Sequence, residues 1–293
     1  MTVCREEKIG FSASITTNAF FLDFANCRLL KDAGIKEIHV TIDGSKKMHD
    51  RIRITKKQEE TFDLIVNNIR SFVEYDEGNS ALIRIHLHSL EDEELEGIID
   101  TMMLFEEYKD RVSFYFRDLF SSSTDTWDVN AAKANRVKED REEISKVIMY
   151  LMKKSLEAGY KLPLFLCKRK FYYCEAENDN KWVIDPEGYL YKCTVAIEKE
   201  RAVGKLLPNG MQFNNRYALW KKKMLSGRIY SCKECSLFPF CWGMCAYCHY
   251  QNQTEEKLQI LREKCSNNIF VNMQLEILKL RYACEKEKEY AGQ

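Results

Sequence analysis

The sequence predicts an α/β chain in which parallel strands with intervening helices are followed by a small, cysteine-rich α+β domain. In the first half, short β-type runs alternate with amphipathic helical runs, and alternating βα units imply parallel strands covered by helices. In the second half the pattern changes to short hairpins, and ten of the twelve cysteines lie between Cys167 and Cys284. We therefore expect two domains, residues 1–160 and 161–293.

The first half contains four candidate strands, at Phe11–Thr17, Glu37–Asp43, Ala81–His88 and Arg111–Leu119. Helical runs separate them, at 20–32, 58–74 and 91–107. In the second of these runs the apolar residues recur at helical spacing, at Phe62, Ile65, Val66, Ile69 and Phe72. Four strands are too few to close a barrel, so we expect an open or partial one.

A long charged helix at Ala131–Gly159 is expected to lead into the second domain. There, Trp182–Ile184 and Tyr189–Cys193 predict a hairpin. The intervening Asp185-Pro-Glu-Gly188 is sound β-turn chemistry. A final helix is expected from about Thr254.

Composition excludes several classes of function. The 45 basic residues balance the 45 acidic ones, which argues against nucleic acid or an anionic membrane as a partner. No apolar run has the length of a membrane span, and no leader pattern is present. We expect a cytoplasmic protein, and in a reducing compartment clustered cysteines are metal ligands more often than disulfides.

The cysteines follow an ordered spacing: Cys174-x13-Gly188-x4-Cys193, then Cys232-x2-Cys235-x5-Cys241-x3-Cys245, then Cys265. Thiolates suit zinc and iron–sulfur clusters, and short spacings bring sulfurs together at little loop-closure cost. Gly188 allows a tight turn before Cys193. Spacing alone leaves structural zinc open, because four-cysteine zinc sites with C-x2-C pairs are common.

This pattern resembles the SPASM domain, the auxiliary-cluster domain at the C-terminus of many radical SAM enzymes that modify peptides and proteins. The resemblance implies two auxiliary 4Fe-4S clusters. One would be held by Cys232, Cys235, Cys241 and Cys265, and the other by Cys174, Cys193 and Cys245. Cys167 is the candidate fourth ligand of the second cluster, and an open iron site that binds substrate is the alternative.

The first half resembles the barrel of the same enzymes. Ser14–Asn18 is similar to the family's TNG strand, and Val40–Gly44 followed by His49, Asp50 and Arg53 is similar to its SIDG…HD..R segment. The resemblance implies a partial radical-SAM-type barrel of about four strands. It also places Thr41 near bound S-adenosyl-L-methionine (SAM).

The motif that binds the SAM-cleaving cluster, C-x3-C-x2-C, does not occur before Phe11. Cys241, Cys245 and Cys248 have this spacing, but no barrel follows them, and the SPASM pattern already uses two of the three. SAM and a third 4Fe-4S cluster are therefore expected only in a full-length family member. We expect that the chain as given does not cleave SAM by itself, and a separate N-terminal radical SAM segment is a candidate partner.

The resemblance implies radical modification of a ribosomally made peptide or protein. In the sulfatase-maturing branch an Asp base follows the cysteine of the G-x4-C element, but Thr194 stands there and is no base at neutral pH. A peptide maturase is therefore favoured over formylglycine formation. A non-catalytic iron–sulfur or zinc remnant that binds a peptide or partner protein is the other hypothesis.

His86 and His88 share one face of a strand, where hydrogen-bonded histidines are favoured over a metal or proton-transfer role. The sequence identifies no catalytic residue.

Overall fold

The computed structural model describes residues 4, 6–118, 141–161, 163, 175–218, 220, 276–280 and 282–283. The chain forms two compact units, one of residues 1–166 with 276–293 and one of residues 167–275. The division lies a few residues after the expected position at 160. Residues 276–293, expected in the second domain, group with the first unit, in which Ile277 is buried.

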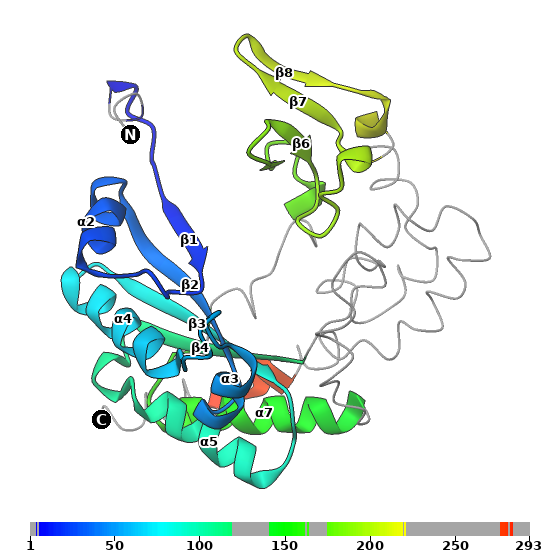
Figure 1. Ribbon diagram of the computed structural model, residues 1–293. Coiled ribbons are helices and arrows are strands. Elements are labelled where there is room, and N and C mark those ends of the chain that lie inside the picture. The colour runs from blue at the N-terminus through cyan, green and yellow to red at the C-terminus, as the bar shows by residue number, and fades with distance from the viewer. Residues whose placement is uncertain are drawn as a thin grey trace. The chain divides into compact units, whose positions relative to one another are not determined.

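The first unit contains four strands: β1 (Ala13–Thr17), β2 (Ile35–Asp43), β3 (Ser80–Leu87) and β4 (Val112–Asp118). They form one parallel sheet in the order β1-β2-β3-β4 (Figure 1). The four strands expected from the sequence are confirmed within two residues at each end. Among the described residues the sheet stays open, with β1 and β4 at its edges.

Helices connect these strands and lie beside the sheet (Figure 1). Four of them, expected from the sequence, are α2 (Phe24–Asp32), α4 (Phe62–Tyr75), α5 (Asp92–Met103) and α7 (Arg141–Glu157). A further short helix, α3 (Lys46–Ile52), was not expected. It has seven residues, too few for an apolar period to be visible in the sequence.

One face of the sheet is apolar and packs against helices. Alternate residues of β2, β3 and β4 share this face and are buried, and they include Ile38, Val40, Ile42, Ile83, Ile85, Leu87, Phe114 and Phe116. Helix α4 packs on β3 and α7 packs on β4. The ring of Phe114 also contacts the rings of Phe105 and Tyr160, at centroid distances of 6.0 and 4.9 Å. This layer is the hydrophobic core of the first unit.

The opposite face carries mostly polar side chains. Register places Thr41 beside Arg84 and Tyr115, and Asp43 beside His86 and Arg117. Parallel strands that are buried on both faces are usually near-continuous apolar runs. Here apolar and polar side chains alternate along the strands, so the second face of the sheet is polar.

The turn after β2 requires a glycine. Gly44 has a φ of +75°, and a Cβ at this position would lie 2.1 Å from Oε1 of Glu94. That carboxylate accepts hydrogen bonds from the backbone N and the Oγ of Ser45, at 2.7 and 2.6 Å. Ser45 also caps the N-terminus of α3. The Asp43-Gly44 turn therefore brings α3 and α5 into close contact.

The second unit contains an antiparallel sheet of four short strands, β5 (Val183–Ile184), β6 (Tyr189–Tyr191), β7 (Gly204–Leu207) and β8 (Gly210–Phe213). The expected β5–β6 hairpin is confirmed, and its turn has Gly188 at a φ of +83°. Oδ1 of Asp185 accepts from the backbone N atoms of Glu187 and Tyr189, at 2.9 and 2.8 Å, which fixes the turn. The β7–β8 hairpin was not expected.

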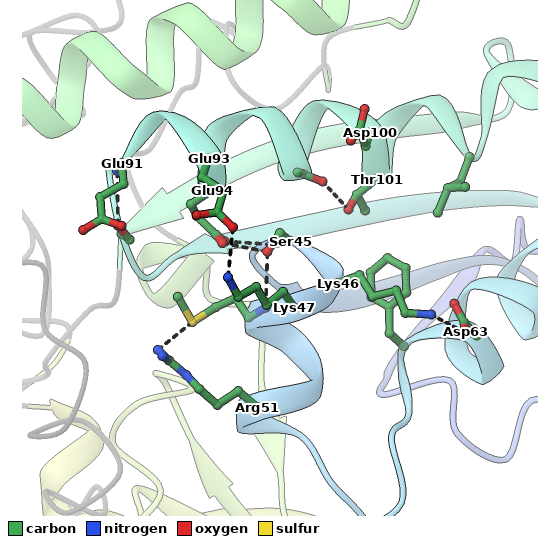
Figure 2. A pocket seen from close by; sticks show the side chains of 15 residues that line it. Ser45, Lys46, Lys47, Arg51, Asp63, Glu91, Glu93, Glu94, Asp100 and Thr101 are labelled. Atoms are coloured by element: carbon green, nitrogen blue, oxygen red, sulfur yellow. Dashed lines mark hydrogen bonds and ion pairs between the residues drawn. The ribbon is translucent and has the colours of Figure 1, made fainter.

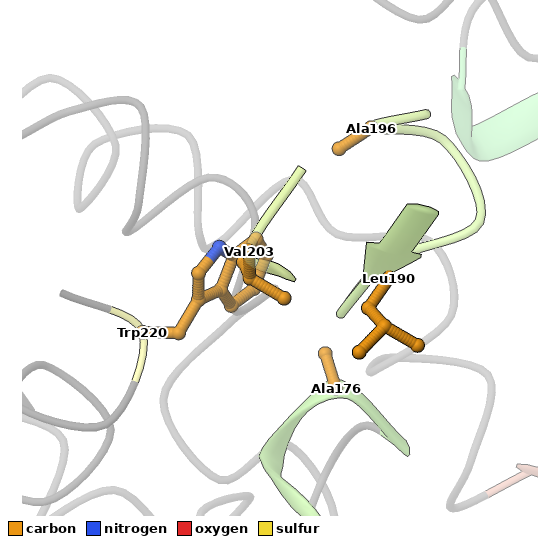
Figure 3. Close-up of a cluster of buried hydrophobic side chains, with 5 residues drawn as sticks. All are labelled: Ala176, Leu190, Ala196, Val203 and Trp220. Carbon is orange, nitrogen blue, oxygen red and sulfur yellow. The ribbon is translucent and has the colours of Figure 1, made fainter. Parts of the chain in front are cut away.

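A small hydrophobic cluster in the second unit includes Leu190 of β6 (Figure 3). Its five buried members are Ala176, Leu190, Ala196, Val203 and Trp220. Cys193 packs against the cluster and is half-buried. The described core of the second unit is therefore much smaller than that of the first.

Among the helices that the structure describes, none combines the length and the apolar character needed to cross a lipid bilayer.

Candidate functional site

The carboxyl ends of β2 and β3 bring together three titratable side chains, Asp43, His86 and His88. Asp43 is the last residue of β2, His86 lies in register with it on β3, and His88 follows directly after β3. In open parallel sheets, ligands bind outside the carboxyl ends of the strands. This edge of the sheet is therefore the candidate functional site.

Asp43 is the centre of the group. Its Oδ1 lies 2.9 Å from Nδ1 of His86 and 3.2 Å from Nε2 of His88, and its Oδ2 forms an ion pair with Nε of Arg53. Only 6% of its side chain is exposed. Burial alone would raise the pKa of Asp43, but the hydrogen bonds from the two histidines and the charge of Arg53 outweigh burial and hold this pKa well below its usual range. Asp43 is therefore ionised at neutral pH.

An ionised carboxylate only accepts hydrogen bonds, so both histidines donate to Asp43. The Nδ1 of His88 is buried and has no hydrogen-bond partner among the described residues. The expectation of hydrogen-bonded histidines is confirmed.

The same three side chains could hold a metal ion, because one ligand atom from each lies within 4.8 Å of the others. Two imidazoles and one carboxylate are a donor set that suits iron(II) or zinc. However, the carboxylate already balances the charge of Arg53. A dication would therefore add uncompensated positive charge to a site with a single acidic residue.

Thr41 lies one row further into the sheet, on the same polar face. Its side chain is buried, and its Oγ1 accepts hydrogen bonds from Nε and Nη2 of Arg84, at 3.0 and 2.8 Å. Thr41 and Asp43 are two residues apart on β2 and point to the same side. The residue that was expected near SAM is thus part of the polar face that ends in the Asp43 group.

The residues between β2 and α4 fix this edge of the sheet. Nδ1 of His49 accepts from the backbone N of Asp43 at 3.2 Å, and its Nε2 lies 3.3 Å from Oγ1 of Thr61. Oδ1 of Asp50 accepts from the backbone N atoms of Thr61 and Phe62, at 3.0 and 2.9 Å, and so caps α4. With Arg53 on Asp43, the His-Asp-x2-Arg segment ties α3, α4 and β2 together.

His49 is held as a neutral imidazole. Burial is the largest cause that lowers its pKa, to about 4, and the nearby charge of Arg53 adds to it. The geometry agrees, because a proton on Nδ1 would face the N–H group of Asp43. His49 therefore supports the site structurally.

A groove of about 550 Å³ lies between α3 and α5 (Figure 2). Its two lysines are already paired across it: Lys47 lies 2.9 Å from Glu93, and Lys46 forms an ion pair with Asp63. Glu94 is occupied by Ser45. This groove is a contact between helices rather than the candidate site.

Of the eight cysteines proposed as cluster ligands, the structure describes Cys193. The other seven lie outside the described residues: Cys167, Cys174, Cys232, Cys235, Cys241, Cys245 and Cys265. Their roles as ligands stay predictions. Cys248 also lies outside the described residues, so the expectation that Cys241, Cys245 and Cys248 do not hold a SAM-cleaving cluster stays a prediction as well. Thr194 directly follows Cys193 and is exposed.

Sequence reasoning missed Arg84 and the pairing of Asp43 with Arg53. A usable signal exists for Arg84. It lies two residues before His86 and four before His88, so three polar side chains occupy one face of a strand that is otherwise apolar. The pairing leaves no such signal, because it depends on how α3 returns to the end of β2.

No family model matches the sequence, and no curated protein matches it. Solved structures match in fold. The structure of native anSMEcpe with bound AdoMet, an anaerobic sulfatase-maturating enzyme of the radical SAM/SPASM class, has a TM-score of 0.64 at 14% sequence identity. The match covers 96% of this chain and 77% of that chain.

The same enzyme with AdoMet and the Cp18Cys peptide matches with a TM-score of 0.64 at 13% identity, over 98% of this chain and 80% of that chain. With the Kp18Cys peptide, the TM-score is 0.63 at 14% identity, over the same shares. At such low identities the likeness establishes the fold. The chain has the α/β fold of these radical SAM enzyme structures, with a four-stranded parallel sheet in its first unit.

Proposed function

We propose that the chain is part of a radical SAM/SPASM-type enzyme that modifies a ribosomally made peptide or protein. The fold likeness carries this proposal, since it extends over nearly the whole chain to structures that hold both AdoMet and a peptide. The ordered cysteines of the second half supply the independent support.

Eight cysteines would hold two auxiliary 4Fe-4S clusters in this proposal. Cys232, Cys235, Cys241 and Cys265 form one set, and Cys174, Cys193 and Cys245 form the other with Cys167. The one described ligand fits this role locally: Cys193 follows a hairpin fixed by Gly188 and lies against the hydrophobic cluster. The thiol of Cys193 is half-buried two residues after the end of β6, and cysteine thiolates are the usual ligands of iron–sulfur clusters.

SAM would bind along the carboxyl edge of the parallel sheet, near Thr41. The polar face there offers hydrogen-bond donors and acceptors beside a helix-packed apolar layer, which suits a polar cofactor. Bound SAM supplies the radical chemistry, whereas the chain supplies binding and orientation. Formylglycine formation is disfavoured, because Thr194 stands where that branch needs a base.

Iron loading tests the proposal. Anaerobic reconstitution of the full chain with iron and sulfide should give a brown protein with about eight iron atoms, the content of two four-iron clusters. Cys232→Ala or Cys235→Ala should remove about half of this iron, whereas Cys27→Ala should leave it unchanged. Stoichiometric tetrahedral zinc, without charge-transfer absorption, would instead support the non-catalytic metal-binding hypothesis.

SAM cleavage is the second measurement on the same samples. The reduced chain should form no 5′-deoxyadenosine above the no-enzyme control. A SAM-cleaving cluster needs three thiolates on one loop, and in this proposal Cys241 and Cys245, two of the three cysteines with that spacing, hold the auxiliary clusters instead. Co-expression with a radical SAM segment that carries C-x3-C-x2-C should restore SAM cleavage. Cleavage by the isolated chain that is abolished by Cys248→Ala would assign the motif to Cys241, Cys245 and Cys248 and overturn the cluster assignment.

A further inference from the structure

The antiparallel sheet of the second unit has an open edge at β8. The strand order is β5-β6-β7-β8, and β8 pairs with β7 on one side only (Figure 1). All four residues of β8, Gly210–Phe213, are exposed. Native edge strands are usually protected by a charged side chain or a proline. The sequence Gly-Met-Gln-Phe contains neither, so β8 itself leaves its open side available to a further strand.

The backbone groups of Met211 and Phe213 point away from β7. In an antiparallel pair, residues that bond to the partner strand alternate with residues that do not. The N–H of Leu206, which lies opposite Met211, bonds to the carbonyl of Gly188 at 2.7 Å instead. The residue after β8 donates its N–H to the carbonyl of Val203 at 3.0 Å. Alternation then places the N–H and C=O groups of Met211 and Phe213 on the open side.

The same two residues carry apolar side chains on one face of the β7–β8 hairpin. Met211 and Phe213 are 47% and 41% exposed, and Leu206 beside Met211 is 44% exposed. The ring of Phe213 stacks on those of Trp182 and Tyr217, at centroid distances of 5.0 and 4.5 Å. We call these five side chains the edge surface. Adjacent apolar side chains that are this exposed are typical of a contact surface.

The backbone groups determine which kind of partner can cover the edge surface. A helix satisfies its own backbone groups, whereas an extended chain can pair with both Met211 and Phe213. Residues directly opposite each other in an antiparallel pair point to the same face. The residues that bond to β8 therefore also place their side chains on the edge surface. The hairpin segment 204–213 contains one lysine and no acidic residue, so its charge favours a neutral or acidic partner over a basic one.

We propose that β8 binds an extended segment of the peptide substrate by antiparallel strand addition. The segment would have apolar residues at two alternate positions, opposite Met211 and Phe213, and a polar or acidic residue between them, opposite Gln212. In strand addition, main-chain hydrogen bonds give affinity and alternate side chains give specificity. The proposal rests on the proposed function, which supplies a peptide as the ligand.

Fluorescence anisotropy with a labelled peptide tests the site on the metal-loaded full chain, without SAM or turnover. The probe is Thr-Val-Glu-Val-Thr, with two valines for the edge surface. N-methylation of one valine should weaken binding about tenfold, because a donor to β8 is lost and the methyl group meets the strand edge. N-methylation of the glutamate is the matched control, because its N–H points away from β8, and it should change binding less than about twofold. Lysine in place of the glutamate should weaken binding about threefold.

Met211→Pro should also weaken binding about tenfold, because it removes an N–H that faces the open edge. Met211→Thr is the matched variant, since it keeps the N–H and should retain most of the binding. Hydrogen exchange in the wild-type chain tests the site even if a variant fails to fold. The amides of Met211 and Phe213 should become protected when the peptide binds, whereas that of Gln212, which faces β7, should change little.

Equal binding of the two N-methylated peptides would overturn the proposal, as would unchanged exchange at Met211 and Phe213. Dimerisation that protects these amides without any peptide would assign the edge to a second copy of the chain and would also overturn it. These outcomes are separate from iron loading. A chain that binds zinc instead of clusters can still bind the peptide at β8, and a chain with both clusters can fail to do so.

Discussion

Each of the two units of the chain has its own kind of internal packing. The first has long parallel strands with an apolar face against helices, and its core includes fully buried Phe72, Phe105 and Phe114. The second has strands of two to four residues over a five-residue cluster, and every residue of β8 is exposed. Hydrophobic burial can specify the first unit alone, whereas the described contacts of the second are too few for that.

Metal removal should have the most different effects on the two units. Structural metal binding is folding free energy, so a chelated chain should lose the second unit and keep the first. Limited proteolysis with mass spectrometry should then show cleavage within 167–275 and a protected fragment from residues 1–166. Resistance of 167–275 after complete metal removal would contradict a structural role for the clusters.

The same substitution in the two units should have unequal costs. Phe114→Ala removes a buried ring that contacts Phe105 and Tyr160, and it should lower the free energy of unfolding by about 3–5 kcal/mol. Phe213→Ala removes a ring that is 41% exposed and stacks on Trp182 and Tyr217, so it should cost about 1 kcal/mol.

Urea denaturation of metal-loaded protein measures both costs. If the two substitutions cost the same, the second unit is more tightly packed around β8 than the exposure of its side chains indicates.

Acid should weaken the first unit through His49. The pKa of His49 is about 4 in the folded chain, against about 6.5 for a histidine in an unfolded chain. The unfolded chain therefore binds more protons between these values, and the free energy of unfolding falls as the pH falls. Between pH 7 and 5 the loss should be about 2 kcal/mol.

Denaturation at several pH values checks this expectation. His49→Gln should remove most of the slope above pH 5, and His39→Gln, a half-exposed histidine on the polar face, should retain it. An unchanged slope in the His49 variant would mean that another group controls acid stability in this range.

The periodicity of apolar residues in the sequence predicted the longer strands and helices of the first unit. The strands β1 to β4 lie within two residues of the expected bounds, and the helices α2, α4 and α5 lie within four. Of the helix expected at Ala131–Gly159, the structure describes Arg141–Glu157 as α7, and residues 131–140 lie outside the described residues. Helix α3 and the β7–β8 hairpin were missed, because seven-residue and four-residue elements are too short to show a period.

The site was predictable only in part. Thr41 was placed near SAM from the family resemblance, whereas His86 and His88 were placed on one face from strand alternation. Their common partner is Asp43, which comes from a different strand, and Arg53 reaches it only because α3 folds back over the end of β2. Such contacts depend on tertiary packing, which local spacing does not contain.

The two-faced sheet has a consequence for how far such sequences can diverge. A helix-facing row needs only apolar side chains of about the right total volume, a condition that many different sequences satisfy. The fold can therefore persist at 14% identity, as the likeness to the solved structures illustrates. The polar rows are free of this packing condition, so residues such as Arg84 can change the chemistry of that face without altering the sheet itself.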